Sequence, residues 1–197
     1  MLNKNNNKSV IVIAALFELI LTTTVITAIL SRQWKILYLS LLAAVCLILP
    51  FIITYISNIK NIMLPPSFNL VSLLFIFSAQ YLGEIKRFYD IFWWWDIFLH
   101  SIFGMYAVII ALYIIQGIIK KKQGITKQRL ILFNGVFSFS FSIALGTLWE
   151  MFEFTADCLF KTNMITGGFQ DTATDLIAKI LAAFITCAVY YHHSLRK

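Results

Sequence analysis

Long apolar runs, separated by short polar stretches, account for most of the chain. An apolar run of about 20 residues crosses a membrane as a helix, because each residue adds about 1.5 Å of length. The pattern predicts an all-α bundle of six spans, at about 10–30, 36–57, 67–83, 96–118, 130–156 and 172–192. No internal repeat or second domain is visible, so we expect one integral membrane domain over residues 1–197.

Prolines and polar stretches indicate where these spans bend or end. Pro50 lies inside the second span, where a kink is expected, and Pro65-Pro66 is expected at or before the start of the third. The stretch "GEIKRFYDIFWWW" predicts a short amphipathic connection into the fourth span. The first run, Val10–Leu30, contains Glu18 and exceeds the about 7–15 apolar residues of a signal peptide, which favours a retained first helix.

Composition supports the membrane assignment. The chain is 60% hydrophobic and only 13% charged, against about 25% charged residues in a typical soluble domain. The net charge of +7 does not indicate nucleic acid, because the basic residues lie between apolar runs rather than on one arm or face. Cys46, Cys158 and Cys187 form no CxxC pair, and two of them fall in apolar runs, which is typical of small core residues.

The basic residues predict an orientation in the bacterial plasma membrane. The Lys120–Arg129 loop holds five of them and is therefore expected in the cytoplasm. Six alternating spans then place both termini inside, with Lys4, Lys8, Lys60, Arg196 and Lys197. Aromatic side chains favour the membrane interface, and Trp34, Trp93–Trp95 and Trp149 are all expected near the outer one.

The carboxylates are distributed less evenly than the basic groups. Of nine Asp and Glu residues, all except Glu18 are expected at the outer ends of spans three to six. Glu18 stands alone in the first span, and either partners the polar region from the side or bonds a hydroxyl such as that of Thr22.

Helical spacing groups the outer carboxylates into three stripes. Side chains three or four residues apart share a helix face. The stripes are Asp96 with His100 and Gly104; Glu150, Glu153 and Asp157; and Asp171, Asp175 and Lys179. Ionisable groups within membrane spans normally face the interior of the helix bundle or a water-filled cavity. The stripes therefore predict a polar pocket that opens to the extracytoplasmic side.

Structural roles compete with a functional one for every residue of these stripes. Asp96 and Asp171 precede helices, where a carboxylate caps free N–H groups and suits the helix dipole. The residues His100, Glu150, Glu153 and Asp175 are also compatible with an internal network closed by Lys179. Against this, the local excess of carboxylates requires protonation, a bound cation or a cationic ligand.

Three segments of the chain resemble a known family. They are "YLGEIKRFYDIFWWWDIFLHSIFG", "GTLWEMFEFTAD" and "GGFQDTATDLIAKILAAF". They resemble the YjdF-like family of uncharacterised bacterial inner-membrane proteins, on Asp96, His100, Gly104, Glu150, Glu153, Asp171, Thr172 and Asp175. The same order is more distantly similar to VanZ-like proteins, but the chain has Glu153 where those have Gln and lacks their Arg in the last segment. The resemblance implies a recurrent membrane site and no particular reaction.

Three classes of function remain open at this stage. An outer-leaflet enzyme would use a divalent cation or acid–base chemistry on lipid headgroups or lipid-linked envelope precursors, with His100, Glu150 and Asp175 as catalytic candidates. A binding protein would hold a cation, or an envelope lipid or lipid-linked ligand, in the polar pocket. A proton- or cation-coupled transporter would use the same groups as a pathway. An accessory protein would use them to hold helices together. Candidate metal ligands are Asp96, His100, Glu150, Glu153, Asp171 and Asp175. Membrane lipids are the expected surroundings, and the sequence is compatible with an oligomer.

Overall fold

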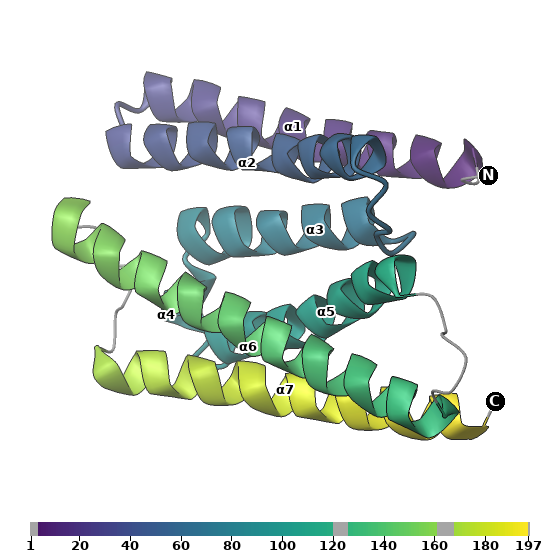
Figure 1. The fold of residues 1–197 in the computed structure, drawn as a ribbon. Coiled ribbons are helices and arrows are strands. Elements are labelled where there is room, and N and C mark those ends of the chain that lie inside the picture. The colour runs from purple at the N-terminus through teal and green to yellow at the C-terminus, as the bar shows by residue number, and fades with distance from the viewer. Residues whose placement is uncertain (1–3, 120–125, 161–167, 197) are drawn as a thin grey trace. The chain divides into compact units, whose positions relative to one another are not determined.

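The computed structural model describes residues 4–119, 126–160 and 168–196, and within these ranges every regular element is helical (Figure 1). The elements are α1 (Lys4–Leu30), α2 (Trp34–Ile59), α3 (Phe68–Ile76), the π-helix η1 (Phe77–Ile85), α4 (Phe88–Ile91), α5 (Trp95–Ile118), α6 (Lys127–Phe160) and α7 (Phe169–Arg196). In the described part, six helical stretches are long and apolar enough to cross a membrane. The all-α, six-span prediction is therefore confirmed.

The third span differs from the regular helix predicted from the sequence. It is continuous from Phe68 to Ile85, but it changes from α- to π-helix at Phe77. The last bond of the wider form joins the Lys86 N–H to the Tyr81 carbonyl oxygen at 2.9 Å. Arg87 then takes a left-handed backbone conformation with φ 62°, which ends the helix and turns the chain into α4. Apolar periodicity does not distinguish these helix types, because it depends on side chains and not on backbone hydrogen bonds.

The contacts fall into two compact units, Met1–Trp95 and Asp96–Lys197. The single domain expected from the sequence remains a prediction. The first unit packs α1, α2, α3 and η1 around a small apolar core of Leu21, Ala43, Leu47 and Leu73. Aromatic rings extend this core, because Phe77 stacks on Phe17 at 3.9 Å and on Tyr81 at 4.8 Å between ring centroids.

Two details of the first unit bear on the sequence predictions. Pro50 lies buried inside α2, and the kink expected there stays a prediction. The helix α3 begins at Phe68, shortly after the Pro65-Pro66 pair, as expected. The Thr22 hydroxyl donates to the backbone carbonyl oxygen of Glu18 at 2.7 Å. Of the two alternatives for Glu18, the bond from the Thr22 hydroxyl to its carboxylate is therefore not formed, because a Thr hydroxyl in a helix reaches the carbonyl four residues back.

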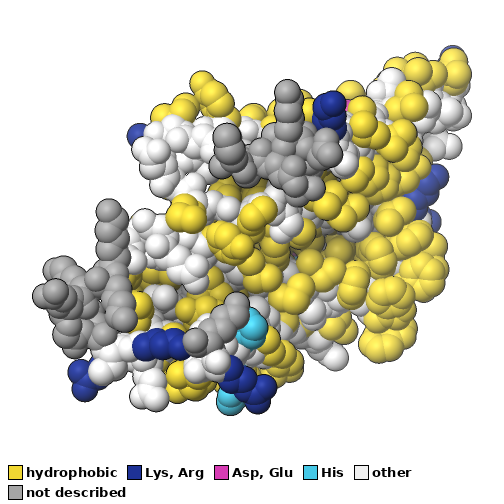
Figure 2. Space-filling model, turned by 90° about the vertical axis from the view of Figure 1, so that its right-hand side faces the viewer, with side chains coloured by type: hydrophobic (Ala, Val, Ile, Leu, Met, Phe, Trp, Pro, Cys, Tyr) yellow, Lys and Arg dark blue, Asp and Glu magenta, His cyan; other side chains and the backbone are white. Residues whose placement is uncertain are grey.

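The second unit contains α5, α6 and α7 around buried Val108, Leu112 and Ala183. Cys187 and Tyr190 of α7 pack against this core. In both units the outer surface is apolar. Figure 2 shows broad areas of hydrophobic side chains on one face, and large apolar residues are exposed along the spans, as is expected of helices surrounded by lipid.

The predicted orientation depends in part on residues outside the described ranges. Lys120, Lys121, Lys122, Lys161 and Lys197 lie there. Among the described residues, the last turn of α7 carries His193 and Arg196, which agrees with a basic end for this helix. The cytoplasmic position of both termini stays a prediction.

Candidate functional site

The second unit is organised around a close approach of α5 and α7. A Cβ atom placed on Gly104 would lie 2.4 Å from the backbone oxygen of Lys179, so only glycine fits at this position of α5. Pairs one turn away on either side keep the same register: His100 meets Asp175, and Val108 and Ala183 share the buried core. The two helices therefore run side by side in the same direction, and the first turns of both lie at the same end.

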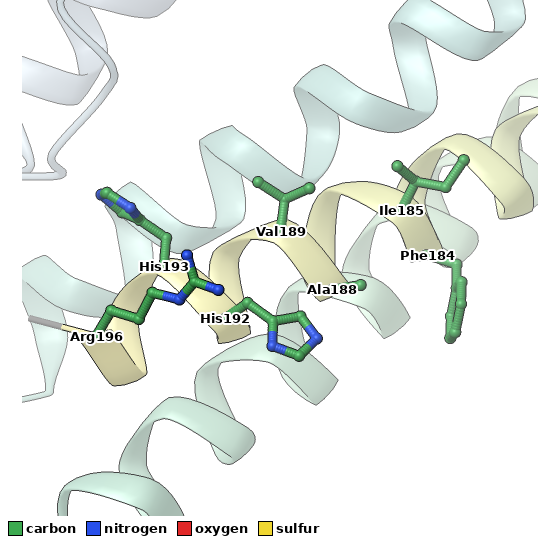
Figure 3. A pocket seen from close by; sticks show the side chains of 7 residues that line it. All are labelled: Phe184, Ile185, Ala188, Val189, His192, His193 and Arg196. Carbon is green, nitrogen blue, oxygen red and sulfur yellow. The ribbon is translucent and has the colours of Figure 1, made fainter.

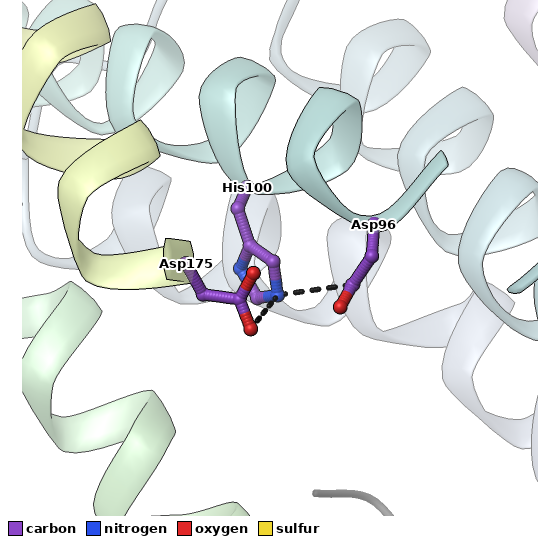
Figure 4. A group of neighbouring side chains, drawn as sticks. All are labelled: Asp96, His100 and Asp175. Carbon is purple, nitrogen blue, oxygen red and sulfur yellow. Dashed lines mark ion pairs between the residues drawn. The ribbon is translucent and has the colours of Figure 1, made fainter. Parts of the chain in front are cut away.

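Asp96, His100 and Asp175 form a cluster one to two turns from this approach (Figure 4). The Nε2 atom of His100 lies 3.1 Å from Asp96 Oδ1 and 3.4 Å from Asp175 Oδ2. His100 and Asp175 are 8% and 4% exposed, and Asp96 is half-buried in the first turn of α5. One imidazole nitrogen carries at most one proton, so it can make a full hydrogen bond to only one of these carboxylates at a time.

The electrostatic surroundings of Asp175 are strongly acidic. The carboxylates of Asp96, Asp171 and Glu150 all lie within electrostatic range of it, and the ammonium group of Lys179 is the nearby cation. Like charges brought together away from water repel strongly, because the local dielectric constant is low. The cluster is therefore suited to hold a proton or a metal cation.

The ammonium group of Lys179 pairs with a carboxylate outside the His–Asp cluster. Its Nζ forms a buried ion pair with Glu150 Oε1 of α6, and the lysine and glutamate side chains are 2% and 5% exposed. The lysine stem crosses Gly146, where an added Cβ would lie 3.1 Å from Lys179 Cδ. The ammonium group also lies 5.9 Å from the centre of the Phe103 ring, within range of a cation–π interaction.

The remaining candidate residues lie around these two groups. Glu153 accepts a hydrogen bond from Trp149 Nε1 at 2.7 Å, and is within electrostatic range of Glu150 and Asp96. Asp171 is half-buried in the first turn of α7. The structure divides the candidate residues into a His–Asp cluster, a Lys–Glu pair and flanking carboxylates.

One feature of α6 was missed by the sequence analysis. After Ile131, its buried positions recur every four residues, at Asn134, Ser138, Ser142, Gly146 and Glu150. The Ser142 hydroxyl donates to the Gly104 carbonyl oxygen at 2.9 Å and so joins α6 to α5. A search for small and polar residues at this spacing, rather than for charges alone, would have found the stripe.

The C-terminal part of α7 bears an open depression of about 420 Å³ (Figure 3). It is lined by Phe184, Ile185, Ala188, Val189, His192, His193 and Arg196. These residues include no member of the His–Asp cluster or of the Lys–Glu pair. The depression is therefore separate from the candidate site.

Comparison with known proteins supports the membrane assignment and provides no activity. An uncharacterised protein of Thermotoga maritima is 28% identical over 123 residues, a match that covers 59% of this chain and 57% of the relative. No solved structure matches the chain. The model of a family described as "Predicted membrane protein (DUF2238)" matches residues 11–196, which include all six spans almost completely. The chain therefore belongs to the DUF2238 family of membrane proteins.

Proposed function

We propose that the protein binds a first-row divalent cation at Asp96, His100 and Asp175, near the extracytoplasmic face of the bacterial plasma membrane. The observation that carries this proposal is the convergence of two carboxylate oxygens on one imidazole nitrogen. The extracytoplasmic position follows from the distribution of basic residues along the sequence. The YjdF-like resemblance fits this proposal, since its shared residues include all three ligands.

The distances within the cluster suit a metal site. Ligand atoms about 2.1 Å from an ion lie about 3.0 Å apart in an octahedral shell and about 3.4 Å apart in a tetrahedral one. The separations of His100 Nε2 from the two carboxylates, 3.1 and 3.4 Å, match these values. All three ligand atoms lie within 4.8 Å of one another, so small carboxylate rotations would close the set.

The ligand types narrow the choice of ion. Imidazole suits zinc, iron and copper, while carboxylates also accept manganese and magnesium. One imidazole with two carboxylates therefore favours Zn²⁺ or Mn²⁺ over Ca²⁺. The surrounding carboxylates favour binding of any of these ions, because a divalent charge relieves the repulsion among them.

The test measures metal bound to purified, tag-free protein. After chelation and desalting, the wild-type chain is titrated with Zn²⁺ and with Mn²⁺, and bound metal is measured by elemental analysis. We expect about one ion per chain, as one three-ligand cluster predicts. His100→Ala and Asp175→Asn should each weaken binding by more than the about 10- to 100-fold that loss of a supporting residue costs.

His193→Ala and Asp90→Asn are the matched controls. They remove a histidine and a carboxylate that are exposed and lie outside the cluster. Both should bind as the wild type does. Equal metal content in the wild type and His100→Ala would overturn the proposal, as would an equal loss in His193→Ala.

A metal-dependent enzyme is the second candidate. Three protein ligands leave coordination positions open, which is typical of catalytic rather than structural metal sites. A position near the interface would present a lipid headgroup or a lipid-linked envelope precursor to the ion. Comparing the lipid profile of cells that express the wild type or Asp175→Asn tests this reaction class; identical profiles would exclude it.

A further inference from the structure

We propose that α6 carries a proton pathway of buried polar groups, and that the methylene stem of Lys179 closes it. This inference goes beyond cation binding and does not depend on it. It rests on the stripe formed by Asn134, Ser138, Ser142, Gly146 and Glu150, which is buried along its whole length.

The length of the stripe suits a path through a bilayer. Sixteen residues separate Asn134 from Glu150, which corresponds to about 24 Å along a helix. The hydrocarbon core of a membrane is about 30 Å thick. Successive stripe residues are four apart, or about 6 Å, which is the distance that one water bridging two oxygens spans.

Three atoms of the stripe point to water that completes the path. Asn134 Oδ1, Ser138 Oγ and Glu150 Oε2 are fully buried and have no hydrogen-bond partner among the described residues. Buried polar atoms are costly unless paired, and ordered water commonly satisfies them. At the far end, Asn134 Nδ2 donates to the Tyr190 hydroxyl at 3.5 Å, which adds another exchangeable group.

Proton transfer along the stripe leaves each hydroxyl group chemically unchanged after one cycle. A hydroxyl accepts a proton from the water on one side and releases its own proton to the water on the other. Reorientation of the hydroxyl then restores its starting state. Glu150 exchanges protons through its free oxygen, and no oxidant or second reactant is required.

The path is interrupted at Gly146. There the side chain of Lys179 fills the space that a larger residue of α6 would occupy, with its Cδ at the closest approach. Methylene groups neither donate nor accept protons, so the segment from Ser142 to Glu150 is blocked while the ion pair holds. Movement of the lysine stem would open it.

Two substitutions of Lys179 distinguish the effect of its methylene stem from the effect of its charge. Lys179→Met keeps an apolar stem and removes the ammonium group, whereas Lys179→Ala removes both. Each chain is reconstituted into vesicles that contain a pH-sensitive dye and a chelator, and proton uptake is driven by a potassium diffusion potential. We expect severalfold faster uptake with Lys179→Ala than with Lys179→Met.

A second substitution shows whether the flux follows the stripe. Ser138→Leu added to Lys179→Ala should return uptake to the Lys179→Met rate, because leucine fills the path and removes its hydroxyl. Thr147→Val is the matched control: that hydroxyl is exposed on the same helix and donates to the Ile143 carbonyl oxygen at 3.0 Å. In the Lys179→Ala chain it should leave uptake high.

Two results would overturn the proposal. One is equal uptake by the Lys179→Ala and Lys179→Met chains. The other is fast uptake that persists with Ser138→Leu, which would indicate a leak unrelated to the stripe. If Lys179→Ala yields no folded protein, Glu150→Gln is added to both the Lys179→Ala and the Lys179→Met chain. This second substitution removes the carboxylate that has lost its lysine, and the two double variants are then compared.

Discussion

Met1–Trp95 and Asp96–Lys197 each contribute three membrane-spanning stretches, yet the two units hold their helices together differently. The first packs apolar side chains around Leu21, Leu47 and Leu73, and a neutral hydrogen bond from the Thr54 hydroxyl to Asn69 Oδ1 at 2.7 Å also joins two of its helices. Its buried polar side chains, Ser40 and Ser57, are neutral. The second buries His100, Glu150, Asp175 and Lys179. Lipid tails are as apolar as leucine, so apolar contact alone drives helix association weakly in a membrane. In the second unit, close glycine contacts and ionic groups add to the apolar core, and the proposed metal ligands lie on the same helices.

The sharpest test of this difference removes one member of the buried ion pair. Lys179→Met leaves Glu150 buried without its cation and should cost about 3–5 kcal/mol of stability. The double variant Lys179→Met/Glu150→Gln should recover most of that loss, because neither charge remains. Unfolding in detergent, followed through a double-mutant cycle, provides the coupling energy. Additive effects of the two single substitutions would show that the pair contributes nothing specific.

The first unit should respond to a cavity rather than to charge. Leu73 is 0% exposed, so Leu73→Ala should cost about 2–5 kcal/mol through lost contacts and unfilled space. Metal content per folded chain should remain at the wild-type value, since the proposed ligands all belong to the second unit. Loss of metal from folded Leu73→Ala protein would contradict this division of roles.

A methyl group at Gly104, where α5 and α7 lie closest, should disturb both the helix packing and the proposed metal site. Gly104→Ala places its Cβ against the backbone of Lys179, which cannot move as a flexible side chain can, and should cost about 1–3 kcal/mol. Separation of the helices would also move Asp175 away from His100 and weaken metal binding. Gly135→Ala is the control, because nothing lies within 4 Å of the added atom. It should be neutral or stabilise α6, since alanine favours helix more than glycine does.

The smallest effect is expected at the exposed ion pair of the first unit. Arg87 Nε donates to Asp90 Oδ2 at 2.7 Å, with side chains 74% and 56% exposed. Asp90→Asn should change stability by less than about 1 kcal/mol, because solvent screens an exposed pair. A thermal shift as large as that of Lys179→Met would remove the distinction between buried and exposed pairs in this protein.

Spacing along single helices predicted which ionisable side chains share a helix face. Residues four apart share a helix face whatever the tertiary structure, so the facing of Asp96 with His100, and of Asp175 with Lys179, followed from the sequence. The partner of Lys179 did not follow, because Glu150, Glu153 and Asp175 were all candidates for it. The π-helical segment of the third span was also not predictable from apolar periodicity.

The sequence by itself determined that the chain is helical, that it has six spans and which helices carry ionisable groups, because apolar length and helical spacing are local properties. Only the tertiary structure decided which groups meet. The closest approach of α5 and α7 lies at Gly104, and this register brings His100 to Asp175 one turn away. The absence of a side chain at Gly146 lets Lys179 reach Glu150. Register between helices depends on such contacts across helices, which no single helix specifies.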